Sequence, residues 1–167
     1  FLLGTMRTPE GRLYRTWRQG SAPKLNAYLE DYANLAEGLL ELYQTTLDER
    51  WFTAARELVE TVVAHFADES SIGFFDTSDD HEALVTRPKN MQDNATPSGN
   101  AMAITVMLKL AAYTGERRYH ELAEAALRPI QAAALQYPTA FAQWLQALWF
   151  AVGGALEIAI VGDPQAP

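Results

Sequence analysis

The sequence predicts an all-α fold built from antiparallel helical hairpins, and three observations support this prediction. Apolar residues recur at helical spacing in five separate segments of the 167-residue chain. About half of the residues are apolar and a fifth are charged, which is typical of a single globular domain. The third observation is an internal repeat, in which each copy consists of a helix, a tight turn and a second helix.

The first two helices are predicted from a broad apolar face. Apolar residues follow an i, i+3, i+4, i+7 pattern over 29–43, and Asn26 is the expected N-cap. Glu30 and Asp31 would suit the positive end of the helix dipole in the first turn. The segment TTLDER interrupts the pattern, and a second helix is expected over 50–66.

Three further helices are expected in the second half of the chain. One begins near Ser98 and runs to Tyr113, where Thr114-Gly115 provides a natural C-terminal stop. The next covers 118–136 and contains Pro129, which should kink or interrupt it. The last covers 139–152.

A few short segments have the composition of strands instead. GRLYRTW (11–17) and GFFDT (73–77) are aromatic or β-branched and lie beside turn residues. EALVTRP (82–88) is expected to pair back on GFFDT as a hairpin, and ALEIAIVGD (155–163) is also strand-like.

The repeat predicts how the helices assemble. LLELYQTTLDERWFTAARELV aligns with VMLKLAAYTGERRYHELAEAAL at an offset of 68, so that Thr46 matches Thr114 and Trp51 matches Tyr119. A weaker match joins FLLGTMRTPEGRLYRTW to HFADESSIGFFDTS. Because one helical pair cannot bury its apolar face alone, repeated pairs stack side by side. A closed or partly closed α/α toroid with its strands and long loops at one rim is expected.

Composition argues against several classes of function. The formal charge of −8 disfavours nucleic acid and anionic membrane surfaces as partners. The absence of cysteine excludes disulfides, thiolate nucleophiles and Cys-ligated zinc, and the three histidines lack metal-binding spacing. We therefore expect no metal and no cofactor. No apolar stretch is long enough to span a bilayer, and a cytoplasmic location is expected. The chain begins without an initiator Met, inside an element, so we expect a portion of a longer protein.

The segment RPKNMQDNATPSGNAMA (87–103) carries the densest polar chemistry. Asp93, Ser98 and Asn100 surround a helix start, where free N–H groups can bind a carboxylate, a hydroxyl oxygen or an anion. Two interpretations stay open. These side chains cap the helix and fix the loop, or the loop lines the mouth of the toroid and presents Asp93 and Asn100 to a polyhydroxylated ligand.

Two more aspartates extend this hypothesis. If Asp31, Asp76 and Asp93 converge, they supply the paired carboxylates that glycoside chemistry uses as acid and as base or nucleophile. Each has a purely structural alternative, such as a carboxylate that complements the helix dipole. Phe75 stacks on a sugar or packs in the core. Arg87 and Lys89 form salt bridges with loop acids or contact an anionic ligand.

Four segments of the sequence can be compared with known families, namely LEDYANLAEGLLELY, IGFFDT, LVTRPKNMQDNATPSGNAMA and the TGE-x-x-Y helix pair. Together they resemble the C-terminal part of the YyaL/spermatogenesis-associated protein 20 family. The resemblance spans nearly the whole chain. It implies an (α/α)6 toroid similar to those of N-acylglucosamine 2-epimerases and six-hairpin glycosidases. It also implies a thioredoxin-like domain N-terminal to the toroid, which this sequence does not contain.

Two functional hypotheses follow. The first is a carbohydrate-active or sugar-binding domain, with epimerase-like or glycosidase-like chemistry at the loop-rich rim. The second is a non-catalytic scaffold that partners a thioredoxin-like domain. Five helices cannot close a twelve-helix ring, so an apolar flank should be exposed, and a homodimer through that flank is expected.

Overall fold

The computed structural model describes residues 1–82, 85–156 and 162. The predicted all-α class is confirmed, because helices dominate these residues and the only sheet among them has two strands. The elements are α1 (Leu2–Thr5), β1 (Tyr14–Thr16), β2 (Lys24–Asn26), α2 (Leu29–Thr46), α3 (Glu49–Phe66), α4 (Gly99–Thr114), α5 (Arg117–Gln136), the 3-10 turn η1 (Pro138–Ala140) and α6 (Ala142–Gly153).

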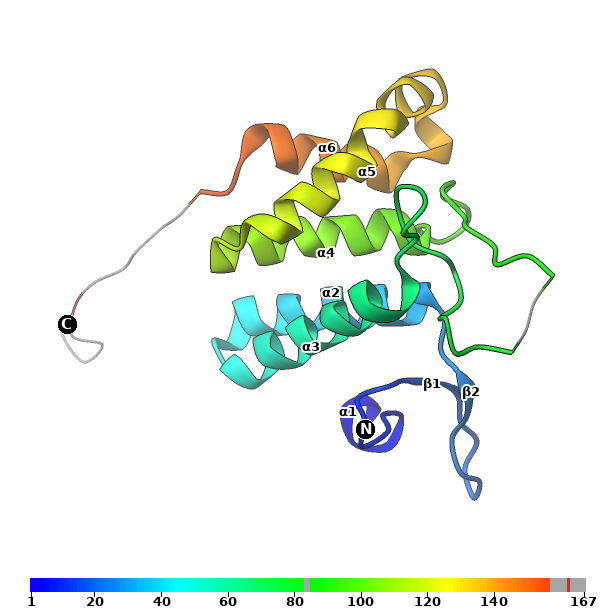
Figure 1. Cartoon of the computed structure of the whole chain (residues 1–167). Helices are drawn as coiled ribbons and strands as arrows, with labels where there is room; N and C mark the ends of the chain where they lie inside the picture. The colour runs from blue at the N-terminus through cyan, green and yellow to red at the C-terminus, as the bar shows by residue number, and fades with distance from the viewer. Residues whose placement is uncertain (83–84, 157–161, 163–167) are drawn as a thin grey trace.

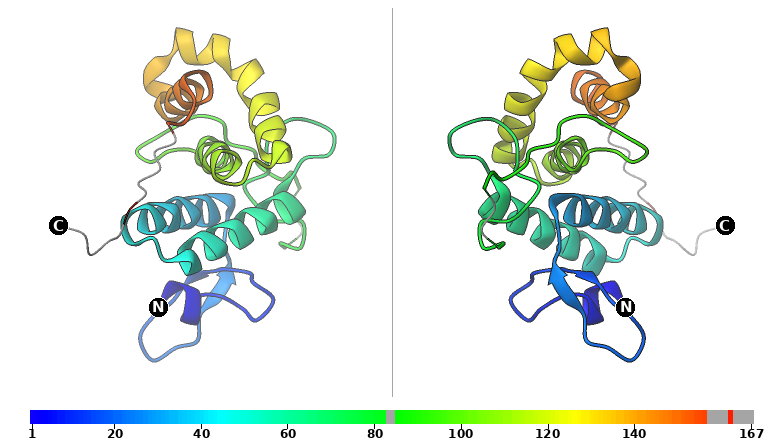
Figure 2. Two further views of the ribbon diagram at one scale, coloured as in Figure 1. Left: turned by 90° about the vertical axis from the view of Figure 1, so that its left-hand side faces the viewer. Right: turned by 90° about the vertical axis from the view of Figure 1, so that its right-hand side faces the viewer.

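The long helices form two layers of antiparallel pairs. α2, α4 and α6 lie one above the other, and α3 and α5 lie alongside them as their return helices (Figures 1 and 2). The N-terminal ends of α2, α4 and α6 point to the same end of the molecule, and the connection 67–98 lies at that end (Figure 1). Polar side chains of this connection are therefore gathered beside three helix starts.

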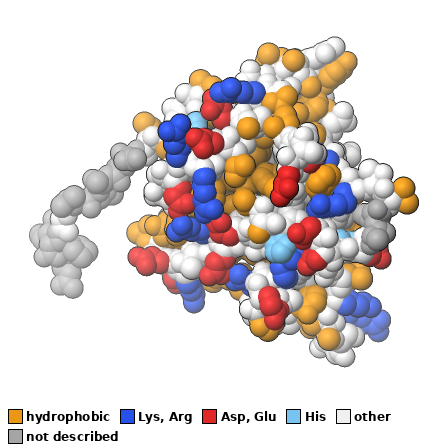
Figure 3. Space-filling model, in the orientation of Figure 1, with side chains coloured by type: hydrophobic (Ala, Val, Ile, Leu, Met, Phe, Trp, Pro, Cys, Tyr) orange, Lys and Arg blue, Asp and Glu red, His pale blue; other side chains and the backbone are white. Residues whose placement is uncertain are grey.

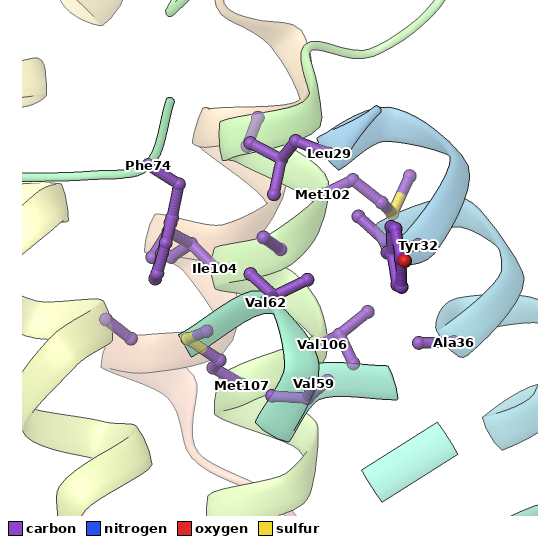
Figure 4. Packing of buried hydrophobic residues seen from close by; sticks show 14 of the residues in the cluster. Leu29, Tyr32, Ala36, Val59, Val62, Phe74, Met102, Ile104, Val106 and Met107 are labelled. Atoms are coloured by element: carbon purple, nitrogen blue, oxygen red, sulfur yellow. The ribbon is translucent and has the colours of Figure 1, made fainter. Parts of the chain in front are cut away.

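The core lies between the two layers. Leu29 and Tyr32 of α2, Val62 of α3 and Ile104 of α4 meet there with almost no exposed surface (Figure 4). α4 is buried along most of its length because it packs against α2 on one side and α5 and α6 on the other. Burial of this apolar area, at about 25 cal/mol per Å², is the main stabilising contribution to the stack.

The helix boundaries agree with the periodicity except at one cap. Ser98 caps α4, and its Oγ accepts a hydrogen bond from the Ala101 amide. The predicted N-cap Asn26 is wrong, since Asn26 lies in β2 and Tyr28 occupies the N-cap position of α2. α5 runs through Pro129 without interruption, so the predicted break is absent, and the helix curves over α6 (Figure 2).

The structure confirms the internal repeat at its tight turns. Thr46 and Thr114 each donate a hydroxyl hydrogen bond to the carbonyl four residues earlier, at 2.7 Å. Leu47 and Gly115, the next residues, both adopt the left-handed conformation, with φ of 55° and 70°. Glycine suits that conformation better than leucine. The second copy therefore has the less strained turn.

The weaker sequence match between segments 1–17 and 65–78 is also seen in the backbone. Arg7 pairs with Leu13 and Ala67 pairs with Phe74 as isolated antiparallel bridges, each after a helix end. In both segments the backbone returns through a glycine with positive φ, at Gly11 and Gly73 respectively. The two loops that follow α1 and α3 therefore share one backbone arrangement.

The strand predictions are confirmed only in part. Segment 11–17 contains β1, whose antiparallel partner is β2. GFFDT forms no strand, and its predicted hairpin with 82–88 is wrong for the described residues of that segment. Among their described residues, the two segments share one backbone hydrogen bond, from the Asp76 amide to the Pro88 carbonyl. Most of 155–163, the last predicted strand, lies outside the described residues.

Candidate functional site

A pocket of about 340 Å³ opens at the end of the molecule where α2 and α4 begin. Its walls come from four segments, which are the start of α2, the GFFDT turn, the middle of the 67–98 connection and the start of α4. The lining residues are Tyr28, Glu30, Asp76, Thr77, Pro88, Asn90, Asn94, Thr96, Pro97, Ser98 and Gly99. One cavity is therefore lined by two carboxylates, two side-chain amides, three serine or threonine residues and the phenol ring of Tyr28.

The starts of α2 and α4 are in close contact at this pocket. A Cβ atom at Gly99 would come within 2.9 Å of the Glu30 backbone nitrogen and 3.0 Å of a Leu29 side-chain carbon. Only a glycine permits this approach, because a contact with backbone cannot be relieved by a rotamer change. The amide of Leu29 also donates to the Asp76 carbonyl at 2.9 Å, which fixes the GFFDT turn to α2.

Glu30 and Asp31, adjacent in the first turn of α2, have different surroundings. Asp31 turns back and accepts the Tyr28 amide at 2.8 Å and an Arg15 nitrogen at 2.9 Å. Burial raises the pKa of the Asp31 carboxyl, although the Tyr28 amide and Arg15 act in the opposite direction. Asp31 lines a neighbouring hollow of about 550 Å³, whereas Glu30 lines both that hollow and the pocket.

Asp76 is the second carboxylate of the pocket. Both of its oxygens lie 3.1 Å from the Asn90 amide nitrogen, which is their only hydrogen-bond donor among the described residues. Burial raises the pKa of the Asp76 carboxyl, the Asn90 amide lowers it, and the charge of Glu30 raises it further. A carboxyl group without a cation, close to another carboxylate, is suited to hold a proton and to donate it.

Asp93 has a different role from Asp76. Its Oδ1 accepts the Ser98 amide and its Oδ2 accepts the Gln143 amide, both at 2.8 Å. One side chain thus binds backbone amides at the starts of two helices, α4 and α6. The structure does not bring Asp31, Asp76 and Asp93 to one pocket, since only Asp76 lines it.

Ser98 lines the pocket but is buried, and its hydroxyl group caps α4. Asn100 is fully buried and connects three backbone groups. Its Oδ1 accepts the Phe74 amide at 2.8 Å, and its Nδ2 donates to the carbonyls of Phe74 at 2.9 Å and Asn90 at 3.1 Å. These bonds hold the GFFDT turn and the connection against α4. The capping interpretation of this segment therefore describes Asn100 and Asp93 well.

The remaining predicted ligand-binding residues form a group beside the pocket. Arg87 lies over the Phe75 ring, 4.1 Å from its centroid, and donates to the His65 and Thr77 carbonyls. Lys89 forms an ion pair with Asp68 at 2.6 Å and donates to the Ile72 carbonyl at 2.9 Å. None of Arg87, Lys89 and Phe75 is among the pocket-lining residues.

The sequence analysis did not select Glu30, which lines the same pocket as Asp76. The helical pattern placed Glu30 and Asp31 in one turn, but it could not show that Asp31 would turn back to the Tyr28 amide. That arrangement depends on Arg15 of β1, which contacts both carboxylates from a separate element. Among the described residues, no three histidine, aspartate or glutamate side chains are arranged to hold a metal ion.

Comparison with known proteins identifies relatives of this chain. Spermatogenesis-associated protein 20 of Mus musculus is 31% identical over 164 residues, which cover 93% of this chain and 21% of the mouse protein. The same protein of Homo sapiens has equal identity and coverage. This chain is therefore similar to a portion of spermatogenesis-associated protein 20. An uncharacterised protein of Caenorhabditis elegans is 27% identical over 142 residues, or 85% of this chain and 19% of that protein.

The resemblance predicted from the sequence motifs to the spermatogenesis-associated protein 20 family is thus confirmed. The chain spans about a fifth of the length of the curated relatives it matches. No protein-family model matches it. Apart from Tyr28, the residues that line the pocket lie in the segments whose motifs carried the resemblance, which are 29–43, 72–77 and 84–103.

Proposed function

We propose that this chain is a sugar-binding, carbohydrate-active domain whose ligand occupies the pocket between α2 and α4. The observation that supports this proposal is the pairing of Glu30 and Asp76 in one cavity with amide and hydroxyl groups. Sugars are recognised by such mixtures of donors and acceptors, and an aromatic ring such as Tyr28 provides an apolar surface for the sugar ring.

The two carboxylates suggest a division of roles in this proposal. Asp76, with its raised pKa, is the candidate acid, and Glu30 is the candidate base or nucleophile. A pair of this kind serves glycoside hydrolysis and also proton transfer in a sugar epimerase. In this proposal Asp31 and Asp93 do not have the catalytic roles predicted from the sequence. They position the starts of helices instead. Asp31 orients the start of α2, and Asp93 orients the starts of α4 and α6.

The toroid remains part of the proposal. The alternation of one layer of α2, α4 and α6 with the return helices α3 and α5 supports it, as does the repeat of the turns at Thr46 and Thr114. In a toroid of this kind the starts of α2, α4 and α6 would face one common opening. We propose that the additional length of the relatives completes the toroid. An epimerase-like or glycosidase-like activity would then belong to the complete toroid.

A titration followed by two-dimensional NMR tests the binding proposal on this chain. Glucose, mannose and N-acetylglucosamine are added separately, up to millimolar concentrations. The amide signals of Tyr28, Thr77 and Ser98 should shift in a saturable manner with at least one sugar. The double variant E30Q/D76N should lose that response, whereas Glu124→Gln on the exposed face of α5 should retain it. No saturable shift with any sugar would contradict the proposal.

A second candidate is a non-catalytic scaffold, and one surface favours it. α6 is apolar except for Gln143 and Gln146, yet Trp149 and Val152 are 77% and 87% exposed. Figure 3 shows hydrophobic side chains on the upper part of the face that α5 presents, and α6 lies behind α5 in this view (Figure 2). A helix that is apolar all round is normally buried. We propose that this face forms the predicted homodimer or binds another helical element.

The α6 face can be tested separately by measuring mass in solution. The wild-type chain should sediment as a dimer at micromolar concentration, and Trp149→Ser should shift it to monomer. Thr139→Ser, on the nearby turn, serves as a control that keeps the dimer. A wild-type monomer at all concentrations would contradict self-association.

No helix of the described chain is both long and apolar enough to cross a membrane.

A further inference from the structure

The pocket between α2 and α4 has an unbalanced charge. Its lining includes the carboxylates of Glu30 and Asp76 but no lysine and no arginine side chain. The cations of the neighbouring connection are engaged elsewhere, because Lys89 pairs with Asp68 and Arg87 covers Phe75. A ligand in this pocket therefore meets negative charge and no positive side chain on the pocket wall.

Arg15 is the cation that approaches closest to this charge, and it is shared. One of its nitrogens lies 2.9 Å from Glu30 Oε1 and another lies 2.9 Å from Asp31 Oδ2. Its guanidinium also stacks on Tyr28, 4.0 Å from the ring centroid. Arg15 reaches Glu30 from the neighbouring hollow, where it is a lining residue, and among the described residues its ion-pair partners are Glu30 and Asp31, not Asp76. One guanidinium is thus shared between the carboxylates of Glu30 and Asp31.

A separate feature indicates that the pocket is built for a polar ligand. Thr77 lines the pocket and is only 3% exposed, and its Oγ1 has no hydrogen-bond partner within residues 1–82 and 85–156. Buried hydroxyl groups normally have a partner. A hydroxyl group can donate one hydrogen bond and accept others, so a ligand carrying N–H or O–H groups would satisfy Thr77.

We propose that the pocket prefers a ligand with a protonated amine, such as an amino sugar, over neutral sugars, and that it rejects sugar phosphates and sugar acids. The ammonium group would lie between Glu30 and Asp76, and hydroxyl groups would bond to Thr77 and to the asparagine amides that line the pocket. This inference rests on the proposed function, because it assumes that the pocket binds a polyhydroxylated ligand. Charge-assisted hydrogen bonds are stronger than neutral ones, and an unpaired anion would be repelled.

The test compares glucosamine, glucose and glucose 6-phosphate as probes at about pH 6, where the amine is protonated. Binding constants come from the NMR shifts of the Thr77 and Ser98 amides. Glucosamine should bind about tenfold more tightly than glucose, which corresponds to the strength of one charge-assisted contact. Glucose 6-phosphate should show no saturable binding. Added salt should weaken glucosamine binding and leave glucose binding unchanged, because salt screens charge.

Variants separate the charge effect from folding. Asp76→Asn should bring the affinities for glucosamine and glucose close together, and Glu30→Gln provides a second variant if the first is unstable. Glu124→Gln, distant on α5, should keep the tenfold difference. Equal or tighter binding of glucose or of glucose 6-phosphate would overturn the amine preference while leaving the sugar site intact. Binding of none of the three, together with no response to the neutral sugars above, would overturn both proposals.

Discussion

Asp76 and Asp93 belong to the same connection between α3 and α4, but the structure uses them differently. Asp93 gives each of its oxygens to a backbone amide, at the starts of α4 and α6. Asp76 has a single amide partner and faces the pocket beside Glu30. The same residue type therefore holds the fold in one part of the loop and remains available to a ligand in the other.

The asparagines of this region show the same contrast. Asn100 is fully buried and all three of its hydrogen bonds go to backbone groups of other segments. Asn90 is exposed and lies on the pocket wall, and among the described residues its side chain has one backbone partner, the Gln92 amide at 3.1 Å, which leaves its NH2 group available. Dense polar chemistry in a loop is thus not evidence for a ligand by itself. The evidence is the subset of polar groups that the backbone leaves without partners.

The largest expected effect belongs to the structural group. Asn100→Ala would leave the Phe74 amide, the Phe74 carbonyl and the Asn90 carbonyl without their partner. Each buried group that loses its bond costs about 1–3 kcal/mol, so the free energy of unfolding should fall by about 4 kcal/mol. Urea denaturation followed by circular dichroism measures this change. A loss below about 1 kcal/mol would show that Asn100 does not hold the loop.

Asp93→Ala should have the next largest effect. The substitution removes the acceptor for one amide at each of two helix starts, and a lost helix cap costs about 0.5–2 kcal/mol. The free energy of unfolding should fall by about 2 kcal/mol in the same assay. Asp93→Asn keeps one acceptor oxygen and should lose about half as much. Equal stability of wild type and Asp93→Ala would refute the two-helix role.

Asp76→Asn should change stability little at neutral pH, by about 1 kcal/mol at most, because only the Asn90 hydrogen bond is altered. The pKa of Asp76 is raised in the fold, so the folded state binds a proton more tightly than the unfolded state. Wild-type stability should therefore decline as pH rises through the range above the ordinary aspartate pKa. Asp76→Asn lacks this decline, and a denaturation series from acid to neutral pH compares the two.

Asp68 should show the opposite dependence, with the smallest effect. The Lys89 ammonium group lowers the pKa of Asp68 to about 2, with further help from Ser70. The stabilisation by this ion pair should be present above the ordinary aspartate pKa and should disappear as the pH falls toward 2. Thermal unfolding of wild type and Asp68→Asn should differ at neutral pH and converge in acid. A constant difference across this range would contradict the ion-pair explanation.

Much of the fold could be predicted because it depends on local patterns. The apolar spacing gave α2 through α6 to within a few residues, and Gly115 and Ser98 marked their ends correctly. The repeat also predicted the matching turns at Thr46 and Thr114. Asn26 failed as a cap because β2 takes it into a sheet with β1, and that pairing depends on residues ten or more positions away.

The candidate site was less predictable, because its chemistry depends on contacts between distant segments. The sequence analysis named Asp76 and Ser98 as site residues, and both line the pocket. It could not show that Arg15 and the Tyr28 amide would hold Asp31 outside the pocket that Glu30 lines. Nor could it show that Asn100 would bond to Phe74, which lies 26 residues earlier. Such choices are made by tertiary packing.

The most direct test of this division measures stability and sugar binding together for Asp76→Asn and Asp93→Asn. Asp76→Asn should unfold at nearly the wild-type urea concentration and bind glucosamine about tenfold more weakly, close to its affinity for glucose. Asp93→Asn should unfold at a lower urea concentration and, in the absence of urea, bind glucosamine with wild-type affinity. The opposite pattern, in which Asp76→Asn loses stability and Asp93→Asn alone loses binding, would contradict the account.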